Sequence, residues 1–134
     1  MLHNMKLQLL DWKVKQVSLS PCEGKRDKGK AGFALGNGLT DDPFEFTVGF
    51  KVSVEEKYYD LEVEMLFRFK SDCEIQEEFL NTDFATINAP AIAFPYVRSF
   101  MSILTLQAGY EPLNIPSINF VKLAESRQDT NKNQ

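Results

Sequence analysis

The chain of 134 residues is 43% hydrophobic and 25% charged, which suits one globular domain with a modest core. Its formal net charge of −4 argues against binding to nucleic acid, because phosphate binding needs a concentrated basic face. The N-terminus lacks the basic and apolar regions of a signal peptide, and no apolar run reaches the length of a membrane span. We therefore expect a cytoplasmic protein that is not inserted into membranes and whose partners are proteins.

The sequence contains no recognisable catalytic or metal-binding motif. The one histidine, His3, lies close to the N-terminus, so a histidine-based nucleophile or acid–base pair has no basis. Cys22 and Cys73 lack the spacing of a zinc site and are expected to be reduced, although a disulfide between them stays open. We expect no enzymatic activity, no cofactor and no metal ion.

Four stretches of the sequence predict β-strands. Residues 5–19 alternate between apolar and polar side chains but change face twice, as a β-bulge or an edge position would require. A glycine-rich connection follows, in which residues 31–35 predict a short second strand. Residues 44–55 and 59–70 alternate almost without exception and predict a hairpin with its turn near residues 56–58. Alternation this long requires a sheet with one buried face and one solvent-exposed face.

The main helix is predicted over residues 96–108. Pro95 suits the first turn of this helix, and Gly109 suits the position just beyond its end. Residues 92–94 could add an earlier turn that begins at Pro90. Phe94, however, precedes a proline and is biased away from helical angles, so we expect a boundary or a kink there.

The predicted helix is apolar around most of its circumference. At about 100° per residue only one narrow stripe is polar, formed by Arg98, Ser102 and Thr105. One sheet can cover only one side of a helix, so the second apolar side favours a homo-oligomer over a helix wrapped by its own loops. The residues assigned to the oligomer interface are Val97, Phe100, Met101, Ile103 and Leu104.

The remaining segments complete an α+β domain. Residues 74–89 have no clear pattern and stay unassigned. Residues 111–117 contain two prolines and are predicted to run extended over the surface before a short turn at residues 119–125. Residues 126–134 contain no apolar side chain and are predicted to be a disordered polar tail. The expected fold is a four-stranded antiparallel sheet with one long helix packed on one face and a short C-terminal helix.

Three short motifs resemble the SecB family of protein-export chaperones. They are FPYVR at residues 94–98, PLNI at residues 112–115 and PSINF at residues 116–120. They occur in the family's order and cover roughly the last third of the chain. The resemblance implies a single SecB-like domain at residues 1–125, assembled as a dimer of dimers with the long helices packed between layers of subunits.

The function implied is that of a holdase, a chaperone that binds unfolded or extended client polypeptides, here for protein export. Such a receptor needs a groove with apolar walls and an accessible strand edge or loop. Ordinary core packing is the alternative explanation for each apolar candidate. The candidate client-binding residues are Phe33, Leu35, Leu113, Ile115, Ile118 and Phe120.

The resemblance also implies a second partner, the SecA motor, which would bind an acidic face of the sheet. The candidate residues for this face are Glu45, Glu55, Asp60, Glu62 and Glu64. The predicted C-terminal helix is much shorter than the family's final helix and the tail is not basic, so client binding is favoured over motor binding. The alternative function is that of a dedicated SecB-like adaptor or structural subunit for one partner, such as an antitoxin, with no role in export.

Overall fold

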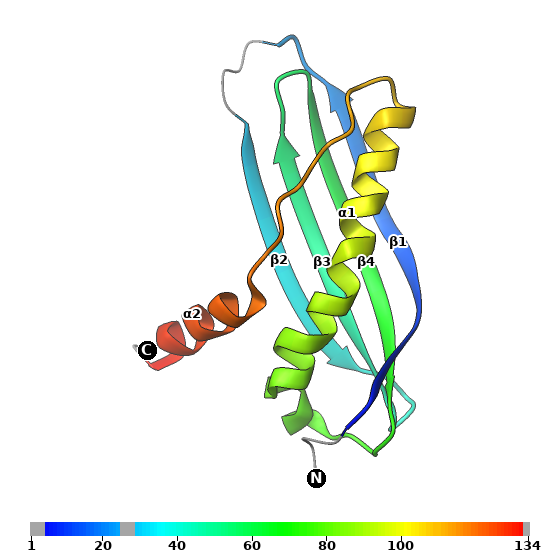
Figure 1. Cartoon of the computed structure of the whole chain (residues 1–134), viewed down its shortest axis with the longest axis vertical. Coiled ribbons are helices and arrows are strands. Elements are labelled where there is room, and N and C mark those ends of the chain that lie inside the picture. The colour runs from blue at the N-terminus through cyan, green and yellow to red at the C-terminus, as the bar shows by residue number, and fades with distance from the viewer. Residues whose placement is uncertain (1–4, 25–28, 133–134) are drawn as a thin grey trace.

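The structure is a computed structural model that describes residues 5–24 and 29–132. The four strands of this part are β1 (Leu7–Pro21), β2 (Lys30–Leu39), β3 (Glu45–Glu55) and β4 (Tyr59–Ser71), and its α-helices are α1 (Ala89–Gln107) and α2 (Phe120–Lys132). The strands form one antiparallel sheet in the order β1-β4-β3-β2, and α1 lies across one face of it (Figure 1). The predicted fold, a four-stranded antiparallel sheet with one long helix and a short C-terminal helix, is confirmed. His3 and the last two residues of the predicted tail lie outside the described residues.

The β3–β4 hairpin supplies most of the core. Its inward side chains are at most 7% exposed: Phe46, Val48, Phe50, Val52, Val54, Tyr59, Leu61, Val63, Met65, Phe67 and Phe69. The register sets Phe50 opposite Met65 and Phe46 opposite Phe69. Burial of one such side chain contributes about 1.5–3 kcal/mol. The apolar side chains that the alternation places on the inner face of this hairpin are therefore a large source of the stability of the fold. Both strands and their turn agree with the prediction to within one residue.

Strand β1 lies at one edge of the sheet and is irregular. Its register with β4 shifts between Leu9 and Asp11 and again between Val14 and Gln16. Each shift moves the following side chains to the other face of the strand. The two changes of face predicted from the sequence correspond to these two register shifts, and the strand lies at an edge of the sheet.

Strand β2 lies at the other edge and is longer than residues 31–35, the range predicted from the sequence. It pairs with β3 along its whole length, including Gly36 opposite Gly49. Glycine weakens a strand and is typical of loops. Here the neighbouring strand β3 holds the glycine-rich backbone in register, so the strand continues to Leu39.

Helix α1 begins at Ala89 rather than after Pro95, which lies inside it. Pro95 and Ala91, four residues earlier, are both exposed, so the helical hydrogen bond that Pro95 cannot make is lost on the solvent side of the helix. Ala89, Ala93 and Phe94 are buried. Their packing outweighs the bias of Phe94 against helical angles, and the predicted boundary at Phe94 is wrong.

The end of α1 agrees with the prediction. Gly109 has a φ of +99°. The amides of Gly109 and Tyr110 donate to the carbonyl groups of Leu106 and Thr105, at 3.1 and 3.0 Å. This is the Schellman arrangement, in which a residue with left-handed backbone closes the last turn.

The segment before α1, unassigned from the sequence, is helical. It forms a 3₁₀ turn at Glu77–Asn81 and a π-helical turn at Phe84–Asn88 that leads directly into α1. The helical stretch Phe84–Gln107 is long and apolar enough to cross a membrane by length and composition alone. Core helices of water-soluble proteins pass the same test, and this helix packs its buried face on the sheet.

Helix α2 continues to Lys132, where a disordered tail from residue 126 was predicted. Asn119 caps its first turn, because its Oδ1 accepts a hydrogen bond from the amide of Lys122 at 3.1 Å. Arg127 Nη2 donates to the carbonyl group of Leu35 on β2 at 3.1 Å. The cap and the contact with β2 stabilise the part of α2 that contains Lys122 and Arg127. The disordered tail expected for residues 126–134 stays a prediction.

We predict that Gly109→Ala lowers the free energy of unfolding by about 1–2 kcal/mol, because alanine is strained in left-handed backbone. A Cβ atom at residue 109 meets no other atom within 4 Å, so the backbone is the sole cause. Gly36→Ala is the matched control, since its Cβ also meets nothing within 4 Å and its φ is not positive. Urea unfolding should show no loss for Gly36→Ala, and equal stabilities of the two variants would contradict the prediction.

Candidate functional site

An extended segment lies beside α1 on the helix side of the sheet. Residues 111–119, here called the return segment, leave the end of α1, cross the sheet and lead into α2 (Figure 1). Pro112 and Pro116 fix their own φ angles and bias the residue before each towards extended backbone. The extended course predicted for residues 111–117 is confirmed.

Two side chains on the polar stripe of α1 hold the return segment. Thr105 Oγ1 accepts a hydrogen bond from the amide of Leu113 at 2.9 Å. Arg98 donates from Nε to the carbonyl group of Ile115 at 2.8 Å and from Nη1 to Ser117 Oγ at 3.3 Å. The polar stripe predicted for this helix therefore faces the return segment.

Most candidate client-binding residues lie between the core and the solvent. Phe120 differs, because it is only 6% exposed and packs against Phe33, Phe50 and Phe94 at ring-centroid distances of 5.8 to 6.5 Å. Phe120 thus belongs to the core and offers a client little surface. The candidates that pack on the core with one side and stay partly exposed are Phe33, Leu35, Leu113, Ile115 and Ile118.

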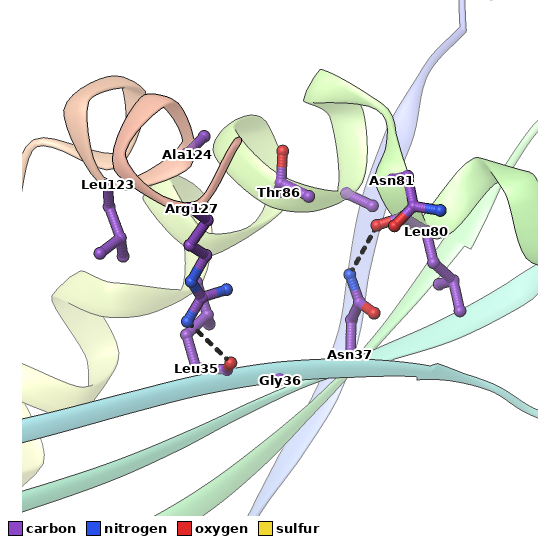
Figure 2. A pocket seen from close by; sticks show the side chains of 10 residues that line it. Leu35, Gly36, Asn37, Leu80, Asn81, Thr86, Leu123, Ala124 and Arg127 are labelled. Atoms are coloured by element: carbon purple, nitrogen blue, oxygen red, sulfur yellow. Dashed lines mark hydrogen bonds between the residues drawn. The ribbon is translucent and has the colours of Figure 1, made fainter. Parts of the chain in front are cut away.

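A hollow of about 400 Å³, here called the α2 pocket, opens between β2, the turns before α1, and α2 (Figure 2). Its apolar lining includes Leu35, Leu80 and Leu123. In Figure 2 the side chain of Asn37 points to the backbone of Leu80, and its Nδ2 donates to that carbonyl group at 2.9 Å. Arg127 reaches the backbone of Leu35 from α2. Mixed walls of this kind suit an apolar side chain together with polar backbone groups.

The edge of β2 borders this pocket. Arg127 reaches the carbonyl group of Leu35, so that group points away from β3. Every second residue of an antiparallel strand directs its backbone groups to the same side. Phe33 and Asn37 therefore also direct theirs outward from the edge of the sheet. An extended peptide could pair with these groups.

A second hollow of about 550 Å³, here called the hairpin pocket, lies at the start of the return segment, against the turn between β3 and β4. The rings of Tyr59 and Tyr110 in its lining are 4.5 Å apart, and Tyr58 is 55% exposed. Burial, with smaller contributions from Glu56 and Tyr110, raises the pKa of Tyr59, so its phenol stays neutral at physiological pH. Leu113 also lines this pocket, and the return segment runs from here to α2, whose residues line the other hollow.

The sequence of the chain matches the model of a known protein family. The model of the SecB family, described as preprotein translocase subunit SecB, matches residues 34–131. The chain belongs to the SecB family. The resemblance read from the three sequence motifs is therefore confirmed.

Individual SecB proteins agree with this assignment. The protein-export protein SecB of Acidithiobacillus ferrooxidans is 33% identical over 98 residues, which cover 72% of this chain and 62% of that protein. The protein-export protein SecB of Orientia tsutsugamushi is 30% identical over 99 residues, covering 70% of this chain and 58% of that protein. The chain thus spans about three fifths of the length of these relatives.

The fold agrees with a solved SecB-like structure. A SecB-like chaperone from Mycobacterium tuberculosis, in complex with a peptide from an antitoxin, superimposes with a TM-score of 0.66. The two sequences are 17% identical, and the match covers 84% of this chain and 87% of the other. At this identity the likeness establishes the fold alone.

The solvent face of this SecB-family sheet carries the acidic candidates, but not as a purely negative surface. Glu62 lies 3.1 Å from Lys51, and Glu45 lies 3.0 Å from Arg68. These cations weaken the negative potential of the face. The candidates on this face are Glu45, Glu55, Asp60, Glu62 and Glu64.

Arg68, which the sequence reading did not single out, links three strands on the same face. Its guanidinium donates to Asp11 of β1 at 2.7 Å and to Glu45 of β3 at 3.0 Å. The hydrogen bond from Arg68 lowers the pKa of Asp11. Both carboxylates hold the Arg68 guanidinium in its charged form. Alternation places these residues on one face, but only the register shows that they meet.

The outward side of α1 is apolar, as the sequence predicted, but its residues differ from those assigned. Val97 and Met101 are completely buried, so they offer no surface to a second subunit. They belong to the core and not to the interface to which the sequence assigned them. Phe100 and Leu104 are partly buried, and Ile103 is 55% exposed. The exposed apolar residues on this side, here called the outer stripe, are Ile92, Tyr96, Ile103 and Leu106.

Two sequence expectations about chemistry can be compared with the structure. Cys22 and Cys73 are free thiols. Within residues 5–24 and 29–132, no three His, Cys, Asp or Glu side chains are grouped to hold a metal ion. We therefore assign no metal-binding residue within these ranges.

We predict that stability falls at alkaline pH in part through Tyr59. The pKa of Tyr59 is raised in the folded chain. The contribution of neutral Tyr59 to stability is therefore fully present below its unfolded-state pKa of about 10, and it is lost as pH rises through the higher folded-state pKa. Tyr59→Phe keeps the ring but cannot ionise, so its free energy of unfolding should fall less steeply above about pH 10. Denaturant titrations at several pH values measure the slopes, and identical slopes would refute the assignment.

Proposed function

We propose that this SecB-family chain is a cytoplasmic holdase that binds unfolded or extended client polypeptides for protein export. The observation that carries the proposal is the partly exposed apolar surface of the return segment and β2, with a hollow at each end. A client for export must stay unfolded until it crosses the membrane, so its receptor has to act in the cytoplasm, where clients are made. The function needs no catalytic group, cofactor or metal ion.

An extended client fits this surface for physical reasons. The outward backbone groups of Phe33 and Asn37 can pair with a neighbouring strand whatever its sequence. Side chains of an extended peptide alternate, so those on one side enter apolar hollows while the others stay in solvent. The partly exposed Leu113 and Ile115 form the wall beside this path. A folded protein hides both its apolar side chains and its backbone groups and is not bound.

The alternative is a SecB-like adaptor for one dedicated client. It is motivated by the Mycobacterium tuberculosis chaperone, which was solved with a peptide from an antitoxin. We favour export because the similar curated proteins are protein-export proteins. A holdase suppresses aggregation of several unrelated unfolded proteins, whereas a dedicated adaptor ignores all but its own client.

SecA is a secondary partner in this proposal. Its contacts would be the acidic candidates on the solvent face of the sheet, Glu45, Glu55, Asp60, Glu62 and Glu64. Lys51 and Arg68 reduce the negative charge of that face. Client binding is therefore proposed as the primary activity.

We predict that the purified protein keeps a reduced and carboxymethylated, permanently unfolded secretory protein in a soluble complex. Ile115→Ser should weaken this binding about tenfold, because it removes one partly exposed apolar side chain from the wall. Light scattering detects the complex, and fluorescence anisotropy of the labelled client measures its dissociation constant.

The matched control for this test is Leu66→Ser, which removes a 37% exposed apolar side chain from the solvent face of the sheet. It should leave client affinity unchanged. A wild-type protein that leaves the unfolded client to aggregate would remove the holdase proposal. Equal losses in the two variants would remove the assignment of the site.

We further propose that the chain forms a homo-oligomer, as a dimer of dimers, through the outer stripe of α1. An apolar stripe on a surface helix is unfavourable in water, and a second subunit would bury it. Of the residues assigned from the sequence, Ile103 contributes most, with Phe100 and Leu104 at its border. The proposal treats the chain as one SecB-like domain from β1 to α2.

We predict that Ile103→Asp shifts the protein to a smaller species, because a carboxylate buried in an apolar interface without a partner is costly. Leu66→Asp is the control, since it places the same charge on the opposite face of the sheet. Sedimentation equilibrium gives the mass of each variant. A wild-type monomer, or a dissociating Leu66→Asp variant, would contradict the proposed interface.

A further inference from the structure

Thr105 is an unusual residue in this core, because it is polar and completely buried. Its hydroxyl group has one hydrogen, which it shares between the carbonyl groups of Met101 and Ser102, at oxygen–oxygen distances of 2.9 and 3.1 Å. A helical threonine commonly bonds to the preceding turn in this way, and that bond alone satisfies its donor. The same oxygen also accepts the amide of Leu113 at 2.9 Å. This second bond serves the return segment and not the helix.

Arg98 provides a second contact on the same side of α1. It lies seven residues before Thr105, which is about two helical turns. Its Nε donates to the carbonyl group of Ile115, and its Nη1 to Ser117 Oγ. Because the guanidinium is planar and rigid, the two donors fix the direction of the segment as well as its distance.

The two contacts together set the register of the return segment. The amide of Leu113 and the carbonyl group of Ile115 point to the same side, as expected for alternate residues of an extended chain. Leu113 and Ile115 are partly buried and pack on the core, whereas Asn114 between them is exposed. A slip by one residue would turn Asn114 towards the core and both apolar side chains towards solvent.

Other means of fixing this register are weak. Pro112 and Pro116 have no amide hydrogen, so a continuous ladder of backbone hydrogen bonds cannot form along the segment. Both side chains are exposed and do not anchor the segment by burial. The prolines keep the backbone extended, but they do not decide which residues face the core.

We propose that Thr105 and Arg98 are positioning residues of client recognition, because they hold the return segment in the register that presents Leu113 and Ile115 as a wall. The proposal rests on the holdase function proposed above. The client touches the apolar side chains of the return segment, and the two polar residues of α1 act through that segment. The narrow polar stripe of an otherwise apolar helix thereby has a role in binding.

The test uses isosteric and conservative variants of the full chain. Thr105→Val removes the hydroxyl and keeps the shape, whereas Thr105→Ser restores the hydroxyl. Arg98→Met removes the donors of the second contact and keeps a long side chain. Ser102→Ala is the matched control, since Ser102 lies on the same stripe and its hydroxyl makes none of the described contacts with the return segment. Two quantities are measured where every variant is folded: the exchange rate of the Leu113 amide by NMR, and the affinity for the permanently unfolded client.

Thr105→Val is expected to speed exchange of the Leu113 amide and to weaken client binding about tenfold. Thr105→Ser should restore both quantities, and Ser102→Ala should change neither. Arg98→Met should weaken client binding to a similar extent, and it carries the test if Thr105→Val does not fold. If the loss of binding came from a general loss of stability, Thr105→Ser would not be expected to restore client binding while Ser102→Ala stays unchanged.

The outcomes separate this inference from the function on which it rests. If the wild-type protein does not bind the client, the holdase function fails and the positioning role fails with it. If the wild type binds and both Thr105→Val and Arg98→Met bind equally well, only the positioning role is overturned. Unchanged exchange of the Leu113 amide in a folded Thr105→Val variant would overturn it too.

Discussion

One α-helix is too narrow to cover a four-stranded sheet, and much of this structure follows from that mismatch. A helix with its side chains is about 10–12 Å wide, whereas four strands at about 4.8 Å span about 19 Å. Helix α1 therefore leaves part of the apolar face open. The return segment crosses this part beside α1 (Figure 1). An extended chain is thinner than a helix, so Phe33 and Leu35 at the β2 edge stay partly exposed, which is where the proposed client surface lies.

The sequence predicted those elements whose residues carry their own periodicity. The β3–β4 hairpin follows from unbroken alternation, and even the irregularities of β1 follow from two changes of face. Predictions failed where packing outweighed a local preference. Pro95 is inside α1 because its side of the helix is exposed while Phe94 is buried. Strand β2 continues past residue 35 because β3 holds its glycine-rich backbone in register.

The residues of the candidate site could be predicted from the sequence, but the contacts between them could not. Leu113 and Ile115 stood out as apolar residues in a proline-containing segment, and Arg98 and Thr105 as a polar stripe on an apolar helix. That these four residues meet depends on how the chain folds back after Gly109, which no pattern encodes. The contact of Arg127 with Leu35 joins residues 92 positions apart. Burial of Val97 and Met101 depends likewise on which side of α1 meets the sheet.

The return segment illustrates what the proposed site would recognise. It is extended and apolar on one side, and side chains of α1 hold it through its backbone amide at Leu113 and its carbonyl group at Ile115. An unfolded client offers the same features, since its apolar side chains and backbone groups are not used internally. Hydrogen bonds to the backbone do not depend on sequence, and shallow apolar hollows discriminate little between similar side chains. A surface of this kind separates unfolded from folded chains more sharply than one unfolded sequence from another, and that is the selectivity a holdase requires.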